Sequence, residues 1–425
     1  MSNVLVGFAG MTHLGVNSAA AALAHGFRVV GYDADRDVIE GLRRGDPPAV
    51  EPGLPDVLRR HASRANYTAD IAELSRCDLV YIASDVPTDD AGESDLAGIR
   101  RLIEAVSGAL ARRAVLVVLS QVPPGFTREL ALPSDRLFYQ VETLVFGQAV
   151  ERAQHPERII LGCADPPAAL PAALAEFLSA FACPILPMRY ESAELAKIAI
   201  NCCLVSSVSV ANTLAELCEC LGASWPEIAP ALKLDKRIGP HAYLAPGLGI
   251  AGGHLERDLA TVCKLADERG TDSGVVRAWI ANSRHRRDWA LQTLHSAVLS
   301  KMEDPVIAVL GLAYKQDTPS TKNSPSLALL AHLAPFRVRV FDPVVPASAA
   351  ANPRCYPATS ELDACDGADA LAMMTPWPQF GRLEPARIAS KLRGKLVLDP
   401  YAMLKAAACR AAGLEYRTLG LRAGT

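Results

Sequence analysis

The sequence lacks the features that mark several special classes of protein. It has no excess of basic charge, with 43 Lys and Arg against 46 Asp and Glu in 425 residues, and this excludes a protein that coats nucleic acid. Aromatic residues make up only 6% and charged residues 21%, but hydrophobic residues make up 50%, which excludes a disordered chain. The length is about three times the ~150 residues of one domain and predicts two or three domains. We expect small, specific partners and no nucleic acid.

Signals for disulfides, export and metal binding are also missing. The eleven cysteines are scattered without a C-x-x-C pair in a chain much longer than disulfide-dependent scaffolds, so we expect reduced thiols and a cytoplasmic location. Met1-Ser2-Asn3 leads into an apolar run without a basic segment, and no stretch of ~18 uninterrupted apolar residues occurs, so neither secretion nor a membrane span is expected. The nine histidines show no H-x-x-x-H or Cys/His cluster, and no metal is expected.

Apolar runs of strand length alternate with helical patterns at both ends of the chain. Such alternation predicts an α/β fold with parallel sheets covered on both faces. The predicted strands of the first part are 4–9, 27–32, 79–83, 114–119 and 158–162, and those of the second are 306–310, 337–341, 368–374 and 395–398.

The middle of the chain is helical instead. Residues 192–221 contain no Pro or Gly and predict a long central helix of ~45 Å. Further helices are expected at 225–234, 256–268 and 274–300, and the Arg284-His285-Arg286-Arg287 run is expected to be a solvated helix face. The Gly/Pro-rich stretch 239–253 is a site candidate. The predicted domains are 1–185 and 303–425, which are α/β, and 186–302, which is helical and contains this loop.

Three polar residues of the long helix share one stripe. Glu194, Lys197 and Asn201 are spaced i, i+3 and i+7. Such a stripe is more often a solvated face than a reaction site, and the residues alone leave both interpretations open.

The first turn of the chain has most of a dinucleotide-binding fingerprint. Gly10 and Gly15 are its outer glycines, and Thr12 stands at the middle position, where its hydroxyl could donate to a phosphate. The helix N-terminus offers free N–H groups to the same anion. Asp33 follows the second strand, where a carboxylate binds the adenosine ribose, so NAD is favoured over NADP; Arg36 weakens this preference.

Later motifs make the sequence resemble the UDP-glucose/GDP-mannose dehydrogenase family. They run in the family's order and cover nearly the whole chain. The resemblance implies two Rossmann-like doubly wound domains joined by a long dimerising helix, and oxidation of the C6 hydroxyl of a nucleotide sugar with NAD. The motifs are Glu51-Pro52-Gly53-Leu54, Asp95-Leu96, Ser120-Gln121-Val122-Pro123, Pro156-Glu157-Arg158, Ala193-Glu194-Leu195-Ala196-Lys197-x-x-x-Asn201, Arg237-Ile238-Gly239, Pro246-Gly247-x-Gly249-x-x-Gly252-x-x-x-x-Arg257-Asp258 and Gly311-Leu312-Ala313-Tyr314-Lys315.

The resemblance also implies roles in the reaction. Lys197 and Asn201 match the family's catalytic lysine and asparagine, which stabilise an alkoxide and orient its oxygen. Asp258 matches an aspartate that holds a water, and Glu142 matches a general base of the hydrolytic half. Gln121 replaces a threonine that helps to hold the catalytic water.

The main departure from the family is His254, which stands where the family has its nucleophilic cysteine. A thiolate is needed to turn an aldehyde into a thiohemiacetal and then a thioester, whereas the first hydride transfer does not need it. We therefore expect an enzyme that stops at the aldehyde. Two alternatives remain: four-electron oxidation through a hydrate with His254 as base, and a catalytically silent paralogue that binds NAD and a nucleotide sugar.

The remaining implied positions concern binding and assembly. Arg237 matches an arginine that reaches the neighbouring subunit's sugar site, which implies a homodimer. Tyr401 stands where the family has an arginine and could stack on the base. The full expected cofactor set is Gly10, Thr12, His13, Leu14, Gly15, Asp33, Arg36, Ser84 and Ser120, and the substrate set is Glu142, Lys197, Asn201, Arg237, Tyr243, Leu244, Gly247, Gly249, Gly252, Gly253, Lys315 and Tyr401.

Overall fold

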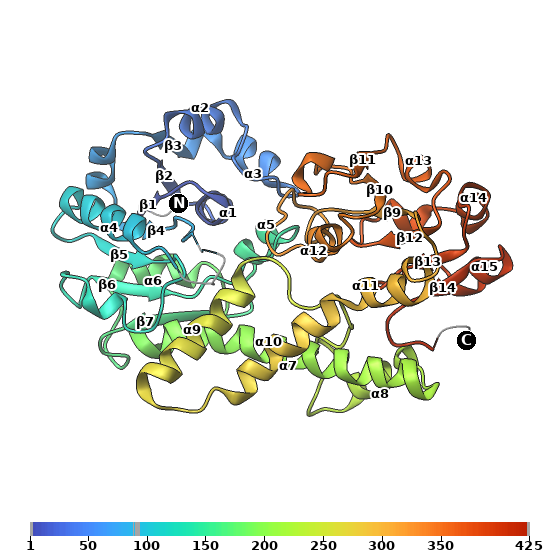
Figure 1. Ribbon diagram of the computed structural model, residues 1–425. Helices are drawn as coiled ribbons and strands as arrows, with labels where there is room; N and C mark the ends of the chain where they lie inside the picture. Colours follow the sequence, from blue (N-terminus) through green and yellow to red (C-terminus); the bar gives the residue numbers. More distant parts are fainter. Residues whose placement is uncertain (1–2, 88, 90–93, 423–425) are drawn as a thin grey trace. The chain divides into compact units, whose positions relative to one another are not determined.

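The apolar runs of the N-terminal part form one eight-stranded sheet in the computed structural model, which describes residues 3–87, 89 and 94–422. Its strands are all parallel to their neighbours except that β6 and β7 are antiparallel. The order is β3 (Ala65–Thr68), β2 (Arg28–Tyr32), β1 (Leu5–Ala9), β4 (Leu79–Ile82), β5 (Val115–Val118), β6 (Leu137–Gln140), β7 (Ile159–Cys163) and β8 (Ile185–Arg189) (Figure 1).

Apolar helices pack on this sheet. The first is rich in alanine, and nine of its residues are buried, because small side chains let the helix lie close to the strands. The helices are α1 (His13–Ala24), α2 (Arg36–Arg44), α3 (Leu54–Arg60), α4 (Ala97–Ala109), α5 (Ala149–Gln154) and α6 (Ala172–Ser179), with short 3₁₀ turns η1 (Ala62–Arg64), η2 (Ile71–Arg76) and η3 (Thr127–Glu129).

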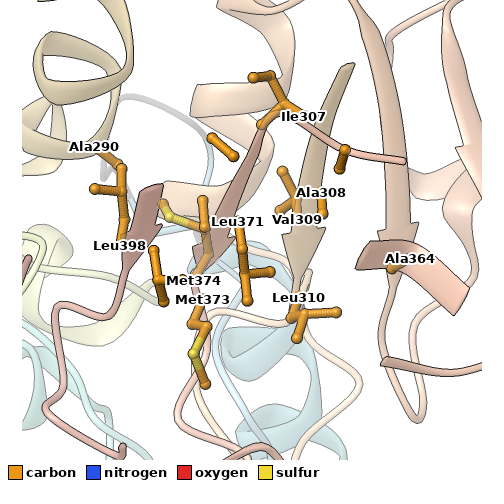
Figure 2. Close-up of a cluster of buried hydrophobic side chains, with 14 of the residues drawn as sticks. Ala290, Ile307, Ala308, Val309, Leu310, Ala364, Leu371, Met373, Met374 and Leu398 are labelled. Carbon is orange, nitrogen blue, oxygen red and sulfur yellow. The ribbon is translucent and has the colours of Figure 1, made fainter. Parts of the chain in front are cut away.

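The C-terminal part repeats the same design with six parallel strands. Figure 2 shows the core side chains of this sheet, with Val309, Leu371 and Leu398 on three neighbouring strands. The order is β11 (Cys355–Pro357), β10 (Arg337–Phe341), β9 (Val306–Leu310), β12 (Ala370–Met373), β13 (Leu396–Leu398) and β14 (Glu415–Arg417), and the helices are α12 (Pro325–His332), η5 (Ala347–Ala349), α13 (Glu361–Cys365), η6 (Phe380–Arg382), α14 (Pro385–Lys391) and α15 (Ala406–Ala411). Both sheets have the 3-2-1-4-5-6 strand order of dinucleotide-binding folds, which confirms the predicted fold class.

A helical segment lies between the two sheets in the sequence. It contains α7 (Tyr190–Leu221), α8 (Trp225–Leu234), α9 (His254–Arg269), α10 (Gly274–Arg287), α11 (Trp289–Leu294) and the π-helical η4 (His295–Leu299). The chain divides into two units, 1–200 and 201–425, with the boundary inside α7. The three-domain division at 185 and 302 stays a prediction.

Helix α7 matches the predicted long helix. Among the described helices it is the one with the length and apolar composition to cross a membrane, and 39% of its most apolar window is buried inside the structure. Length and composition alone do not separate a membrane span from the core helix of a water-exposed fold. The second half of α7 makes polar contacts within the C-terminal unit.

One of those contacts corrects a sequence-based expectation. Arg286 of α10 is only 1% exposed, and its guanidinium donates to Glu219 of α7 at 2.8 Å. Glu219 also accepts from Trp289 Nε1 at 3.2 Å and from the backbone N–H of Gly420 at 2.9 Å. The prediction of a solvated face is therefore wrong for Arg286, because a buried cation requires a partner that the local sequence does not show.

Candidate functional site

The first turn shows why glycine stands at its two outer positions. Gly10 has φ +93°, and a Cβ there would lie 2.7 Å from the Ser84 nitrogen. A Cβ on Gly15 would lie 1.9 Å from the Gly10 carbonyl oxygen. The end of β1, the start of α1 and the end of β4 therefore approach as closely as a dinucleotide-binding turn requires.

The Thr12 hydroxyl has a partner within the protein. It donates to the Ala83 carbonyl at 3.2 Å and makes no cap hydrogen bond to α1. This contact ties the turn to the end of β4, and the expected donation from Thr12 to a phosphate stays a prediction. The first N–H groups of α1 are left to receive an anion.

Asp33 lies at the predicted end of β2 and is partly exposed. Its Oδ2 accepts from Met11 N at 2.7 Å and its Oδ1 from Asp35 N at 3.0 Å, which leaves lone pairs for a ribose. The Arg36 side chain is exposed at the start of α2. Nearby, the Ser120 hydroxyl donates to the Ser84 carbonyl at 2.5 Å and joins the ends of β4 and β5. The residues of this turn fit NAD.

The C-terminal sheet contains a second turn of the same geometry. Gly311 has φ +92°, and its N–H donates to Phe341, as Gly10 N–H donates to Tyr32. Asp342 takes the place of Asp33, but it accepts from five groups instead of two, which are the backbone N–H of Leu312, Ala313, Val344 and Val345 and the Trp377 indole. Asp342 is thus committed to holding its own turn, and only the first turn keeps a carboxylate available for a ribose.

Lys197 and Glu142 meet in the N-terminal unit. Lys197 Nζ lies 2.6 Å from Glu142 Oε1 and donates to the Glu142 carbonyl at 3.1 Å. The other carboxylate oxygen, Oε2, accepts from Leu144 N at 2.9 Å. Both side chains are mostly buried, at 11% and 19% exposed, so the ammonium is held in a low-dielectric setting where its charge acts strongly.

Glu194, one turn before Lys197, faces inward. It is fully buried, and its carboxylate accepts from Gly125 N at 2.6 Å and Thr127 N at 2.9 Å. Burial raises the pKa of the Glu194 carboxyl, and these hydrogen bonds oppose that rise. The residue holds the loop that follows Gln121, a role that sequence analysis missed. The stripe of α7 is not a solvated face.

Asn201 and Asp258 meet in the C-terminal unit. Asn201 Nδ2 donates to Asp258 Oδ2 at 2.5 Å, and Arg257 Nε donates to Asp258 Oδ1 at 3.3 Å. All three side chains are buried, with Asn201 at 8%, Arg257 at 4% and Asp258 at 1% exposed. The amide of Asn201 is therefore oriented by a carboxylate that an adjacent cation compensates.

His254 is the first residue of α9 and is exposed. It shares a helix face with Asp258, four residues further on. Cys263 is buried, and burial next to Asp258 raises the pKa of the Cys202 thiol to about 11. A thiol with a pKa this high is mostly protonated at neutral pH and is a poor nucleophile, so Cys202 does not have the environment of a reactive cysteine.

The glycine-rich loop before α9 is tied to the loop that follows β9. Gly252 N donates to the Lys322 carbonyl at 3.0 Å, and Asn323 Nδ2 donates both to the Gly252 carbonyl, at 3.1 Å, and to Glu256. A Cβ on Gly252 would lie 3.0 Å from the Tyr314 ring. Lys315 Nζ stands 5.8 Å from the centre of that ring. These contacts hold the glycine-rich loop against residues 314–323, and its expected role in binding a diphosphate stays a prediction.

Glycine is required at another position of this loop. A Cβ on Gly249 would lie 2.3 Å from the Ser283 carbonyl oxygen, and Gly247 N donates to Asn212 Oδ1 at 2.8 Å. Gly253 is the N-cap residue of α9, and a Cβ at this position would meet no atom closer than 3.6 Å. The roles of these glycines toward a substrate stay predictions.

Several residues that are predicted to bind ligands make contacts within the protein itself. The Tyr401 hydroxyl donates to the Met374 carbonyl at 3.2 Å, and its ring packs against the C-terminal core, so its stacking on a base stays a prediction. Leu14 and Leu244 are buried at 5% and 7% exposed. The Tyr243 side chain is 53% exposed. Arg237 is 89% exposed at its side chain and pairs with Asp235 at 2.6 Å.

Sequence reasoning also missed the role of Glu51. Its carboxylate is buried, lies 2.7 Å from His13 Nε2 and accepts from the backbone N–H of Gly147 and Ala149. The sequence shows Glu51-Pro52-Gly53-Leu54 as a motif of the family. It does not show that the partners of Glu51 are His13 and Gly147, which lie 38 and 96 residues away.

Comparison with known proteins gives a consistent result. Models of the UDP-glucose/GDP-mannose dehydrogenase family match the chain at residues 4–181 (NAD binding domain), 191–284 (central domain) and 308–406 (UDP binding domain). In residues 3–87, 89 and 94–422, no group of three or more His, Cys, Asp or Glu residues is placed to hold a metal ion.

Individual relatives match over almost their whole length. A UDP-glucose 6-dehydrogenase of Pseudomonas aeruginosa is 31% identical over 97% of this chain and 96% of its own, and UDP-glucose 6-dehydrogenase TuaD of Bacillus subtilis is 28% identical over 97% and 92%. The structure of a UDP-glucose dehydrogenase from Pyrobaculum islandicum superimposes with a TM-score of 0.86 at 27% identity, covering 99% of this chain and 98% of that one. The chain belongs to the UDP-glucose/GDP-mannose dehydrogenase family and is an NAD-dependent nucleotide-sugar dehydrogenase.

Proposed function

We propose that the enzyme oxidises the C6 primary hydroxyl of a UDP- or GDP-hexose to the aldehyde and stops there. The observation that carries this proposal is the exposed His254 at the first position of α9, where the family's cysteine nucleophile is expected. The half-buried Cys202 supports it, because burial raises the pKa of its thiol to about 11. The reaction consumes one alcohol and one NAD and yields one aldehyde, one NADH and one proton. When bound, NAD supplies the hydride acceptor.

The residues on α7 perform the oxidation in this proposal. Lys197 uses two of its three N–H donors on Glu142, and the third donates to the sugar oxygen as negative charge develops there. The Glu142 carboxylate accepts the hydroxyl proton. Asn201 lies one turn further along α7, and its amide is oriented by its hydrogen bond to Asp258.

The experiment that tests the proposal is the ratio of NADH formed to nucleotide sugar consumed, with the mass of the product. UDP- and GDP-hexoses and their N-acetyl forms are assayed in turn. One NADH per sugar with an aldehyde or its hydrate supports the proposal. Two NADH and a carboxylate contradict it and favour the hydrate route, in which His254 acts as base; NAD binding without turnover favours a silent paralogue.

We further propose that the chain works as a homodimer through α7. Four apolar residues, Val210, Leu214, Leu217 and Leu221, are 52%, 39%, 49% and 76% exposed and are spaced i, i+4, i+7 and i+11. This is the spacing of a helix seam that packs against a second helix. The exposed Arg237 is then free to reach the partner's sugar site.

Charged residues in this seam should prevent dimerisation. The double variant Leu214→Glu/Leu217→Glu is expected to sediment at half the mass of the wild type. Burying two unpaired carboxylates on each subunit costs more free energy than the apolar contacts of the seam contribute. Val50→Glu, at a side chain that is 90% exposed in the other unit, is the matched control and should leave the mass unchanged. An unaltered mass for the double variant would contradict the assignment of the seam to α7.

A further inference from the structure

Glu51 is a buried carboxylate held by three different groups. Its residue is 4% exposed and its side chain 0%. Gly147 N donates to both carboxylate oxygens, at 3.0 and 2.9 Å, and Ala149 N donates to Oε2 at 3.3 Å. The third group is His13, whose Nε2 lies 2.7 Å from Oε1. These donors fix the position of the buried Glu51 carboxylate, because loss of any one of them would leave part of its negative charge without a hydrogen bond.

His13 is the first residue of α1, next to the N–H groups that receive the cofactor phosphates. Its ring stacks on Phe146, with 4.1 Å between ring centres and 29° between planes. The imidazole therefore contacts the same segment twice, once through Glu51 and once through the Phe146 ring. Its side chain is 14% exposed, which leaves one edge of the ring open toward the turn.

Phe146, Gly147 and Ala149 belong to the segment that carries Glu142. At one end, Glu142 is held by Lys197 and by its own bond from Leu144 N. In the middle, Arg152 Nε donates to the Thr143 carbonyl at 2.8 Å. At the other end the anchor is Glu51. Gly147 has φ +85°, so this backbone makes a bend that glycine permits.

We propose that His13 and Glu51 are positioning residues that couple NAD binding at α1 to the placement of residues 142–149. A phosphate at the start of α1 restrains His13, His13 restrains Glu51 and Phe146, and these restrain the backbone that leads back to Glu142. The inference depends on NAD as the cofactor and not on the aldehyde as the product. It assigns a function to Glu51 through its contacts with His13, Gly147 and Ala149.

Amide hydrogen exchange of the full-length dehydrogenase tests the coupling directly. In the wild type, saturating NAD without any sugar is expected to slow exchange in the peptide covering 144–149 about tenfold, a typical strength of coupling between two sites. In His13→Phe, which keeps the stacked ring but cannot hydrogen-bond Glu51, saturating NAD should still protect the start of α1 and should leave 144–149 unchanged.

A conservative variant separates coupling from mere structural damage. His13→Gln places an amide N–H close to the position of the imidazole Nε2, and it should restore the NAD-dependent protection of 144–149. Should His13→Phe fail to show a cooperative melting transition, Glu51→Gln is measured in its place, with the same loss of response expected. The proposal is overturned if NAD slows exchange at 144–149 equally in wild type and in the folded variant that lacks the His13–Glu51 bond.

Discussion

The His254→Cys variant is expected to form two NADH per nucleotide sugar and a carboxylate product, whereas we expect one NADH and an aldehyde from the wild type. The substituted thiol would stand at the first position of α9, where the N–H groups and dipole of a helix N-terminus favour a thiolate. The thiolate adds to the aldehyde carbon, the resulting thiohemiacetal gives up the second hydride to NAD, and water hydrolyses the thioester to the carboxylate and the free thiol.

The measurement combines absorbance of NADH with the mass of the isolated product. His254→Ala is the matched control, because it removes the imidazole without adding a nucleophile and should keep the ratio at one. Alkylation with iodoacetamide gives an independent readout, since it should inactivate the second step of His254→Cys and leave the wild type active. A ratio that stays at one in His254→Cys would show that the surrounding residues no longer support the second oxidation.

Lys197→Met is expected to lower kcat about 10³-fold, which is the usual effect of removing one charge-stabilising group from an active site. The ammonium is mostly buried and lies 2.6 Å from Glu142 Oε1. It is the group that we expect to stabilise the alkoxide before hydride transfer. Methionine keeps the length and apolar stem of the side chain and removes only the charge and its donors.

Steady-state rates and NAD titrations of the same preparation measure this effect. NAD affinity should stay within about twofold of the wild type, because Lys197 lies on α7 and not at the cofactor turn. Lys197→Arg, which keeps the charge in a different geometry, should recover part of kcat. Because removing Lys197 leaves Glu142 without its cation, the melting temperature is recorded alongside. A kcat within tenfold of the wild type in folded Lys197→Met would exclude Lys197 as the stabilising charge.

The regular elements follow from patterns that short stretches of sequence carry. Residues 192–221 have no Pro or Gly and form most of α7, and the run 306–310 forms β9. Gly10, Gly15 and Asp33 could be placed in one turn because the strand, the glycines and the helix are neighbours in sequence and each glycine meets a steric limit that only glycine satisfies. The position of His254 within the glycine-rich motif could be assigned for the same reason, since a motif aligns residue by residue.

Partners distant in sequence could not be found in this way. The stripe that holds Glu194 and Lys197 was recognised, but a helical period says which residues share a face and not what packs against it. Only the folded chain brings Glu194 to Gly125, 69 residues away, Asn201 to Asp258, 57 residues away, and Glu51 to Gly147, 96 residues away. The Thr12 hydroxyl likewise meets the Ala83 carbonyl, 71 residues away. The local sequence pattern thus predicts the helices, the strands and the candidate reactive positions. The burial of charged side chains and their pairing depend on long-range packing, because each buried charge is paired with a group on whichever element the fold places beside it.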